Sequence, residues 1–439
     1  MTAEMRRGWR NAVLCTAALV VWSAGAAVYD VKRFGAVGDG VAKDTVAIQK
    51  AIDAAAAAGG GTVEVPAGTY LTGSLYLKSN VDFFVSQGAT LKGSPDKEDY
   101  NPPDVCPQNS WSKVECANGG HLLLCIEQKN VTLRGPGTID GNCAPFLIGP
   151  DGRQYSYGHI PWRPSQMVYF VECENVRVQD LRLRNSPYWS LFLHGCTHVF
   201  VRGLDVRTGR KWHSPEDCFV GQGDCIDIDC CQHVSVSDCQ LYGSDDGITL
   251  RACRQRLKRP QDTRYVTIQN CTISTHSCAF RFGVGDGKVS NVTVSNIVIW
   301  ETRAAFDFCT SWGKTGVSYD NIMIGNVVVE ECRWFFRASY HGIAGTDMRG
   351  IRMHDIKATV KANSPLWGKT DKLENSLIWG RGDNPIRDVR FINVECNTPI
   401  ELINVEGCEI VGGTLKAAAL SPSEMSDRRQ KIENGYHPN

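Results

Sequence analysis

The sequence predicts an all-β protein, a single-stranded right-handed parallel β-helix (solenoid) with a short N-terminal capping helix. Two observations predict this fold. Glycine accounts for 43 of the 439 residues, about a tenth against a usual share of about 7 %, so the chain turns often and long helices are not expected. In addition, a short pattern of a polar turn residue followed by alternating apolar positions returns along the chain. Alternation at period two gives short strands with one buried face, and recurrence gives one unit stacked many times.

The repeat is clearest in the first apolar residue of each copy. These residues are Val81, Val131, Val176, Val199, Val234, Val266, Val292, Ile322, Ile351 and Val389. From Val176 onward, subtracting successive positions gives intervals of 23, 35, 32, 26, 30, 29 and 38 residues. A helical solenoid would need stretches with a period of 3.6, which are absent after the first quarter, and no blade signature of a propeller is found. The unequal intervals place insertions in turns on one side, where a binding face would form.

The chain is expected to divide into three segments. Residues 1–26 are a predicted signal peptide, residues 27–420 form one β-helix domain, and residues 421–439 are a polar, loosely ordered tail. Near the start, Asp44 and Thr45 are expected to cap a helix that ends at glycines 59–61. Its apolar face comprises Ala47, Ile48, Ala51, Ile52 and Ala55. Such a helix would cover the apolar end of the solenoid.

The N-terminal segment has the order of a secretory signal. Arg6, Arg7 and Arg10 precede an apolar run over residues 12–22, and small residues lead to a cleavage site after Ala26. A membrane anchor is the alternative, but about a dozen apolar residues are too few to cross about 30 Å of hydrocarbon. We therefore expect a secreted or periplasmic protein that has no membrane partner.

Cysteine usage fits stacked thiols better than a metal centre. Of 19 cysteines one lies in the signal, which leaves 18. Cys173, Cys196 and Cys231 each stand shortly before a repeat strand, at equivalent positions, so we expect a ladder of small buried side chains. The local pairs considered for disulfides are Cys106–Cys116 and Cys218–Cys225. Zinc is not expected, because the metal-type spacing of cysteine pairs is missing.

Charge composition excludes one class of partner. The chain has 47 basic and 47 acidic side chains, and binding to nucleic acid needs a basic excess to displace counterions. A monomer without a nucleic-acid partner is expected.

The densest carboxylate cluster holds the predicted catalytic residues Asp224, Asp245 and Asp246. The 21 residues from Asp224 to Asp245 are about one short coil, so Asp224 should stack against the Asp245–Asp246 pair. Neighbouring carboxylates repel, and one should keep its proton near neutrality beside ionised bases. Hydrolysis of a glycosidic bond needs this combination. An acidic turn ladder or a calcium site is the alternative.

Several short segments occur in a set order around this cluster. They comprise residues 34–40, 44–45, 66–70, 135–141, 185–189, 222–229 and 244–246. In this order they resemble glycoside hydrolase family 28, the polygalacturonases and rhamnogalacturonases, over nearly the whole chain after residue 26. The resemblance implies a parallel β-helix and an inverting hydrolase of a pectic or related acidic polysaccharide. Asp245 would be the general acid, and Asp224 and Asp246 would hold and activate water. No cofactor or metal is expected.

The sequence departs from the family's pattern at two segments. Cys278 stands where the family has a histidine, and His276 is the nearest substitute, although a solvated turn histidine is an equal alternative. Asp307 and Cys309 stand where an arginine and a lysine grip galacturonate. Because an aspartate there would repel a carboxylate by roughly 1 kcal/mol at 4 Å even in water, unmodified polygalacturonate is expected to be a poor substrate.

Other side chains are candidates for binding an acidic sugar. Arg251 and Arg281 lie on predicted strands next to the acidic motifs, and we assign them to substrate binding together with His276. A basic run follows, comprising Arg254, Arg256, Lys258, Arg259 and Arg264, with a solvated loop as the alternative. Trp189, Trp312, Trp334 and Tyr340 could stack on sugar rings, although packing is the commoner role of such residues.

Two other functions remain open on this fold. A β-eliminating polysaccharide lyase would use calcium and an arginine or lysine base. A non-catalytic glycan-binding β-helix is conceivable because the family's histidine, arginine and lysine are missing. The complete set of three aspartates argues against the binder, since binding alone has little need for three repelling carboxylates.

Overall fold

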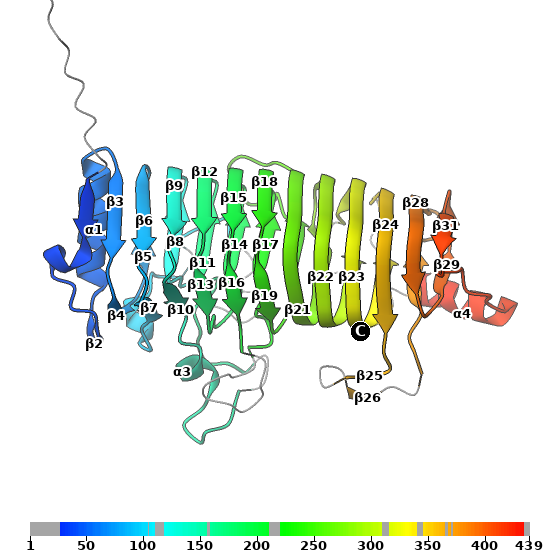
Figure 1. Cartoon of the computed structure of the whole chain (residues 1–439), viewed down its shortest axis with the longest axis horizontal. Helices are drawn as coiled ribbons and strands as arrows, with labels where there is room; N and C mark the ends of the chain where they lie inside the picture. The colour runs from blue at the N-terminus through cyan, green and yellow to red at the C-terminus, as the bar shows by residue number, and fades with distance from the viewer. Residues whose placement is uncertain are drawn as a thin grey trace, which may run out of the picture.

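Stacked coils along one axis form the molecule (Figure 1). The computed structural model describes residues 27–103, 105–109, 118–155, 159–209, 220–309, 316–339, 346–364, 368–369 and 372–433. In this part of the chain, 29 strands join one hydrogen-bonded sheet, and the only antiparallel pair of strands is the short β25 (Asn363–Ser364) and β26 (Gly368–Lys369). The predicted parallel β-helix is therefore confirmed.

Each coil contributes strands to three faces of the solenoid. The first face comprises β1 (Val28–Asp30), β3 (Gly61–Val65), β6 (Val81–Val85), β9 (Lys129–Arg134), β12 (Glu174–Gln179), β15 (Thr197–Arg202), β18 (Gln232–Ser237), β30 (Val405–Glu406), β31 (Glu409–Gly413) and the first parts of β24 (Arg349–Val360) and β28 (Ile386–Cys396). The later parts of β24 and β28 continue onto the second face. The second comprises β2 (Asp39–Lys43), β4 (Gly68–Thr72), β7 (Ala89–Gly93), β10 (Thr138–Asp140), β13 (Arg182–Arg184), β16 (Asp205–Arg207) and β19 (Gln240–Gly243). The third comprises β5 (Leu75–Tyr76), β8 (Leu123–Ile126), β11 (Val168–Val171), β14 (Leu191–His194), β17 (Ile226–Asp229), β20 (Ile248–Ala252), β27 (Ser376–Trp379) and β29 (Ile400–Ile403).

Three long strands continue from face to face. They are β21 (Thr263–Gly285), β22 (Lys288–Cys309) and β23 (Ser318–Ser339). In β21, for example, successive parts pair with β18, β19 and β20 of the preceding coil. One uninterrupted strand thus serves all three faces.

The register of the first face confirms the sequence repeat. Val131 pairs with Val176, which pairs with Val199, and the series continues through Val234 to Val266. The later positions follow in the same register up to the last pair, Ile351 with Val389. These side chains are buried in one continuous core. The apolar repeat is therefore the inner surface of the solenoid.

Polar ladders mark the turns between faces. Asn130 and Asn175 both have left-handed backbone conformations, with φ of 55° and 56°. The Asn175 side-chain amide donates to Asn130, and that of Asn130 donates to Asn80. Asparagine tolerates the left-handed region better than most residues, which explains why it recurs at this turn. A second ladder includes Asn270, which accepts a hydrogen bond from the side-chain amide of Asn296.

The predicted thiol ladder is also present. Cys173, Cys196 and Cys231 are buried in the core one coil apart, and Cys173 lies 3.6 Å from the sulfur of Cys125. Burial raises the pKa of the Cys196 thiol well above its usual value, so this thiol stays protonated. The partners considered for disulfides, Cys116 and Cys218, lie outside the described residues.

Helix α1 (Thr45–Ala57) covers the N-terminal end of the core, as predicted (Figure 1). Ile48, Ala51, Ile52 and Ala55 are completely buried. The side chain of Asp44 does not cap this helix. Its carboxylate accepts hydrogen bonds from the amides of Val37 and Gly38 and so holds the preceding loop.

The prediction of a loosely ordered C-terminal tail is wrong for residues 422–433. Residues Pro422–Glu433 form helix α4 at the other end of the molecule (Figure 1). Ile432 packs against Trp379 and Leu377 of the last coils. Ser421 and Glu424 form a capping box, in which each side chain accepts the other's backbone N–H. This segment is short and polar, so the sequence shows no clear helical spacing of apolar residues there.

The described part of the chain has three further short helices, one of which, η1, contributes the buried Val31 to the core. They are α3 (Ala144–Leu147), η1 (Val31–Phe34) and η2 (Lys97–Asp99). Among the described residues, no helix is long and apolar enough to cross a membrane.

Removal of one stacked ring should measure the strength of the core. Phe308 is fully buried and lies 4.2 Å from Phe282, ring centroid to ring centroid, with nearly parallel planes. We expect Phe308→Ala to lower the free energy of unfolding by about 3–5 kcal/mol in urea unfolding. Phe200→Ala, at a ring that is 43 % exposed, should cost less than about 1 kcal/mol. Equal losses in the two variants would contradict the assigned core.

Candidate active site

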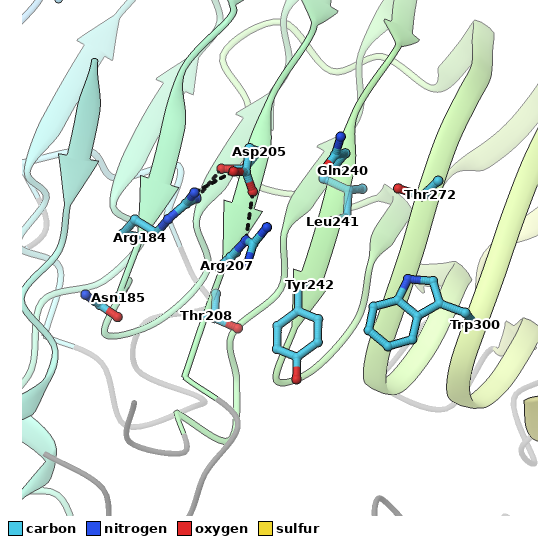
Figure 2. A pocket seen from close by; sticks show the side chains of 10 residues that line it. All are labelled: Arg184, Asn185, Asp205, Arg207, Thr208, Gln240, Leu241, Tyr242, Thr272 and Trp300. Atoms are coloured by element: carbon cyan, nitrogen blue, oxygen red, sulfur yellow. Dashed lines mark hydrogen bonds and ion pairs between the residues drawn. The ribbon is translucent and has the colours of Figure 1, made fainter. Parts of the chain in front are cut away.

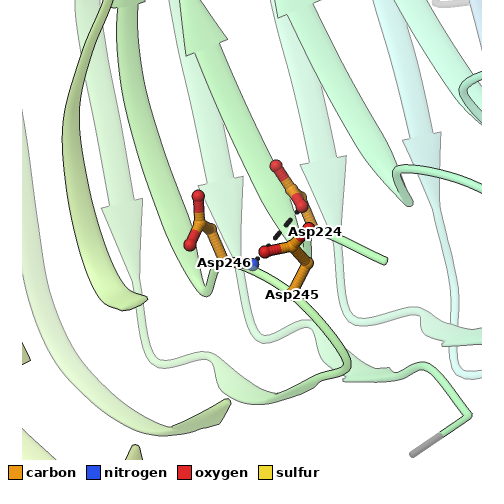
Figure 3. Close-up of side chains that lie close together, drawn as sticks. All are labelled: Asp224, Asp245 and Asp246. Atoms are coloured by element: carbon orange, nitrogen blue, oxygen red, sulfur yellow. Dashed lines mark hydrogen bonds between the residues drawn. The ribbon is translucent and has the colours of Figure 1, made fainter. Parts of the chain in front are cut away.

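Three aspartates meet where the chain enters the third face. Asp224 lies just before β17, and Asp245 and Asp246 lie just before β20. The register pairs Ile226 with Ile248, which places Asp224 opposite Asp246, as the one-coil spacing predicts. One oxygen from each carboxylate lies within 4.8 Å of the others (Figure 3). Asp224 and Asp246 are 5 % exposed, whereas Asp245 is partly exposed.

Backbone hydrogen bonds fix the turns that carry these aspartates. The carbonyl of Asp224 accepts from Ser190 in the preceding coil, and the carbonyl of Asp246 accepts from Cys225. The amide of Asp246 donates to a carboxylate oxygen of Asp224 at 3.3 Å. Gly223 permits this packing, because a Cβ atom there would lie 2.2 Å from the hydroxyl of Ser244.

Asp246 belongs to a buried charge network on the outward side of the third face. Arg281 donates to Asp246 through Nε and to Asp307 through a terminal nitrogen at 3.0 Å. Asp307 also accepts from Arg337 at 2.6 Å. Although burial would lower the pKa of Arg337, Asp307 raises it above its usual value. These two arginines and two aspartates compensate one another's charge.

This network corrects the expectation for Asp307. The register places Asp307 between Arg281 and Arg337 on adjacent strands, and both arginines contact its carboxylate. Its charge is thus neutralised inside the protein. Asp307 is therefore not the uncompensated charge that the predicted repulsion assumes, and poor activity on unmodified polygalacturonate stays an untested prediction.

Cys278 occupies the position where the resembled family has a histidine. Its backbone amide donates to Asp246 at 3.0 Å, and its thiol lies against Asp307 and Arg281. Burial raises the pKa of this thiol well above its usual value, so it is a neutral packing group. His276 lies two residues earlier on β21 and is partly exposed, and its role in substrate binding stays a prediction.

Arg251 lies deeper than its assignment to substrate binding implies. It is 3 % exposed, and its guanidinium lies within 3.5 Å of Asp227 and 3.4 Å of Asp229. The guanidinium also covers the ring of Trp189 at 4.4 Å. Its direct contact with substrate stays a prediction.

The basic run folds back onto acidic side chains. Lys258 pairs with Glu127, and the backbone amides of Lys258 and Arg259 donate to the buried Glu172. Arg254 lies 3.4 Å from Asp262. These contacts favour the structural alternative for the run.

The aromatic candidates are also buried where the structure describes them. Trp189 and Trp334 are 2 % and 3 % exposed, and Arg333 and Arg337 cover the ring of Trp334. Trp312 and Tyr340 lie outside the described residues.

Sequence reasoning missed Arg337. The signal was available, because the interval of 30 residues between Val292 and Ile322 also carries Asp307 to Arg337 on the next coil. The apolar positions of the repeat do not by themselves point to the outward polar positions that lie between them.

Fold and site together define a parallel β-helix protein with a cluster of three aspartates at the edge of one face. Residues 59–372 match the family model of glycosyl hydrolases family 28, and the chain belongs to this family. A Vitis vinifera protein named "Probable polygalacturonase" is 25 % identical over 314 residues, which are 69 % of this chain and 61 % of that protein. A mannuronan C5-epimerase of Azotobacter vinelandii is 61 % identical over 133 residues, 28 % of this chain and 13 % of the epimerase.

A solved structure supports the fold. The exopolygalacturonase of Thermotoga maritima aligns with a TM-score of 0.65 at 20 % identity, covering 89 % of this chain and 91 % of that one. The chain spans only part of the length of these relatives, 61 % of the Vitis protein and 13 % of the epimerase.

Breaking the charge network should cost more than breaking a surface ion pair. We expect Asp307→Asn to lower the free energy of unfolding by about 3–5 kcal/mol, because two buried arginines lose their shared carboxylate. Asp307→Arg should be worse still. The control is Asp383→Asn, at a side chain that is 71 % exposed and pairs with Arg381, where about 0–1 kcal/mol is expected. If Asp307→Asn is as mild as the control in urea unfolding, the network does not hold the site.

Proposed function

We propose that the protein is an exported glycoside hydrolase that cleaves a uronate-containing pectic polysaccharide and inverts the anomeric centre. The observation that carries the proposal is the meeting of Asp224, Asp245 and Asp246 within 4.8 Å in a chain of glycosyl hydrolases family 28. Asp245 donates a proton to the leaving oxygen. Asp224 and Asp246 hold the attacking water and accept its proton.

The different surroundings of the aspartates support these roles. Asp246 is held by Arg281 and by the amide of Cys278, which fix the position of its carboxylate in the site. Asp245 is the most exposed of the three and is therefore the one that can reach a glycosidic oxygen. The predicted contact of Arg281 with substrate stays a prediction, and through its hydrogen bond to Asp246 Arg281 also serves as a positioning residue.

The close spacing of the carboxylates constrains the position of the water. The two carboxyl groups of an inverting enzyme usually lie about 6.5–9.5 Å apart, which leaves room for the attacking water. The oxygens here are closer. In this proposal the water is held by Asp224 and Asp246 beside the acid, and not between two facing carboxylates.

The names of the relatives support a uronate substrate. Polygalacturonase and mannuronan epimerase both denote enzymes of uronic-acid polymers. The neutralised Asp307 removes the objection to unmodified galacturonate. Export follows from the predicted signal at residues 1–26, which lie outside the described part of the chain, and we propose a secreted or periplasmic monomer.

The acid role predicts a specific loss of turnover. Asp245→Asn keeps the shape of the side chain but cannot donate the proton, so kcat should fall by about 10²–10⁴ on the best of a panel of pectic and other uronate glycans. The exposed Asp383→Asn should match the parent. Retention of more than about half of the parent turnover by Asp245→Asn would refute the assignment.

A polysaccharide lyase is the second candidate, because three carboxylate oxygens this close could hold a divalent cation. A lyase would form unsaturated sugars that absorb ultraviolet light, and a chelator would abolish the reaction. We expect reducing sugar to appear without an absorbance rise and chelator to leave the rate unchanged. A chelator-sensitive absorbance rise would replace the hydrolase proposal with the lyase.

A further inference from the structure

A pocket lies on the second face of the solenoid, apart from the outward side of the third face that carries the charge network. It is built on β13, β16, β19 and the middle parts of β21 and β22, and has a volume of about 490 Å³. Figure 2 shows an aromatic pair at one side and an arginine–aspartate group at the other. Ligand pockets are commonly about 300–1,000 Å³, so this one is large enough for a few sugar residues.

The aromatic pair consists of Tyr242 and Trp300. Their ring centroids lie 5.8 Å apart with planes at 29°, and Figure 2 shows the rings next to each other. They come from β19 and β22, with Ser274 of β21 on the strand between them. This small, buried side chain leaves room for the rings to approach. Trp300 is 40 % exposed, in contrast to the buried Trp189 and Trp334.

The opposite side of the pocket carries a net positive charge. Asp205 accepts hydrogen bonds from Arg184 and Arg207. These bonds hold the pKa of Asp205 below its usual value against the opposing effect of burial. Two arginines with one carboxylate leave one positive charge, and the Arg207 side chain is 59 % exposed. An arginine guanidinium suits the planar geometry of a carboxylate.

The pocket is connected to the catalytic turn. Thr208 lines the pocket, and its hydroxyl accepts a hydrogen bond from the Ser244 amide at 2.7 Å. Ser244 directly precedes Asp245, and Tyr242 lies three residues before it. A ligand in the pocket would therefore lie near the turn that carries the general acid.

We propose that this pocket is a second carbohydrate-binding site, which holds a uronate-containing segment of the polysaccharide away from the bond that is cleaved. An aromatic pair offers flat apolar surface to the C–H face of a pyranose ring, and the exposed arginine binds a uronate carboxylate. The combination fits an acidic sugar better than a neutral sugar or an apolar peptide. The choice of a uronate rests on the proposed function, whereas the pocket itself does not.

Affinity electrophoresis tests the site without catalysis. The full chain carrying Asp245→Asn is run in gels that contain polygalacturonate, with and without Trp300→Ala. Because aromatic and arginine side chains often dominate binding sites, we expect Trp300→Ala to weaken retardation about tenfold in apparent Kd. Arg207→Glu should weaken it further. Phe200→Ala is the matched control, since Phe200 is an exposed ring on the first face beneath Arg177, and it should change nothing.

Kinetics in the otherwise unmodified chain separate this proposal from the proposed function. Trp300→Ala should raise KM for polygalacturonate about tenfold relative to KM for the galacturonate trimer. If Trp300→Ala and Arg207→Glu both bind and cleave like Phe200→Ala, the second site is refuted while the hydrolase stands. If the parent cleaves no uronate glycan, the hydrolase is refuted, yet binding that depends on Trp300 would still support the pocket. Matching thermal midpoints show that the variants are folded.

Discussion

The parallel register between successive coils fixes the position of every other feature. Each residue lies beside the equivalent residue of the next coil, because neighbouring strands are about 4.8 Å apart. Residues of one kind at equivalent positions therefore form a row along the axis. Apolar residues at the inner positions form the core. Asparagines at one turn form a ladder of amide hydrogen bonds. The same register brings Asp224 beside Asp246, although 22 residues separate them in the chain.

Stacking of like residues is favourable for apolar groups but costly for charges. On the outward side of the third face, positive and negative side chains alternate from coil to coil and so avoid this repulsion. Arg281, Asp307 and Arg337 follow one another on adjacent strands. Removing one member of such a buried series leaves charge without compensation. The network ends at Asp246, so the same interaction that stabilises the coils also orients a carboxylate that we propose as a base. Stability and chemistry are therefore coupled at Arg281.

Much of this organisation could be predicted from the sequence. The apolar period predicts the face and register of the strands, and the one-coil spacing predicts the aspartate cluster. Features that depend on partners from distant coils could not be predicted in this way. Asp307 looks like a repelling charge until Arg337 is placed beside it. Helix α4 depends on burial of Ile432 against Trp379, which its polar composition conceals.

We propose that the three aspartates catalyse a single displacement by water. Proton NMR of the products during the first turnovers on an oligogalacturonate measures it directly, before the released sugar equilibrates between its anomers. We expect the new reducing end to appear first with the configuration opposite to that of the cleaved bond. Appearance of the same configuration would show a covalent intermediate on one of the aspartates, and would contradict the roles assigned to Asp224, Asp245 and Asp246.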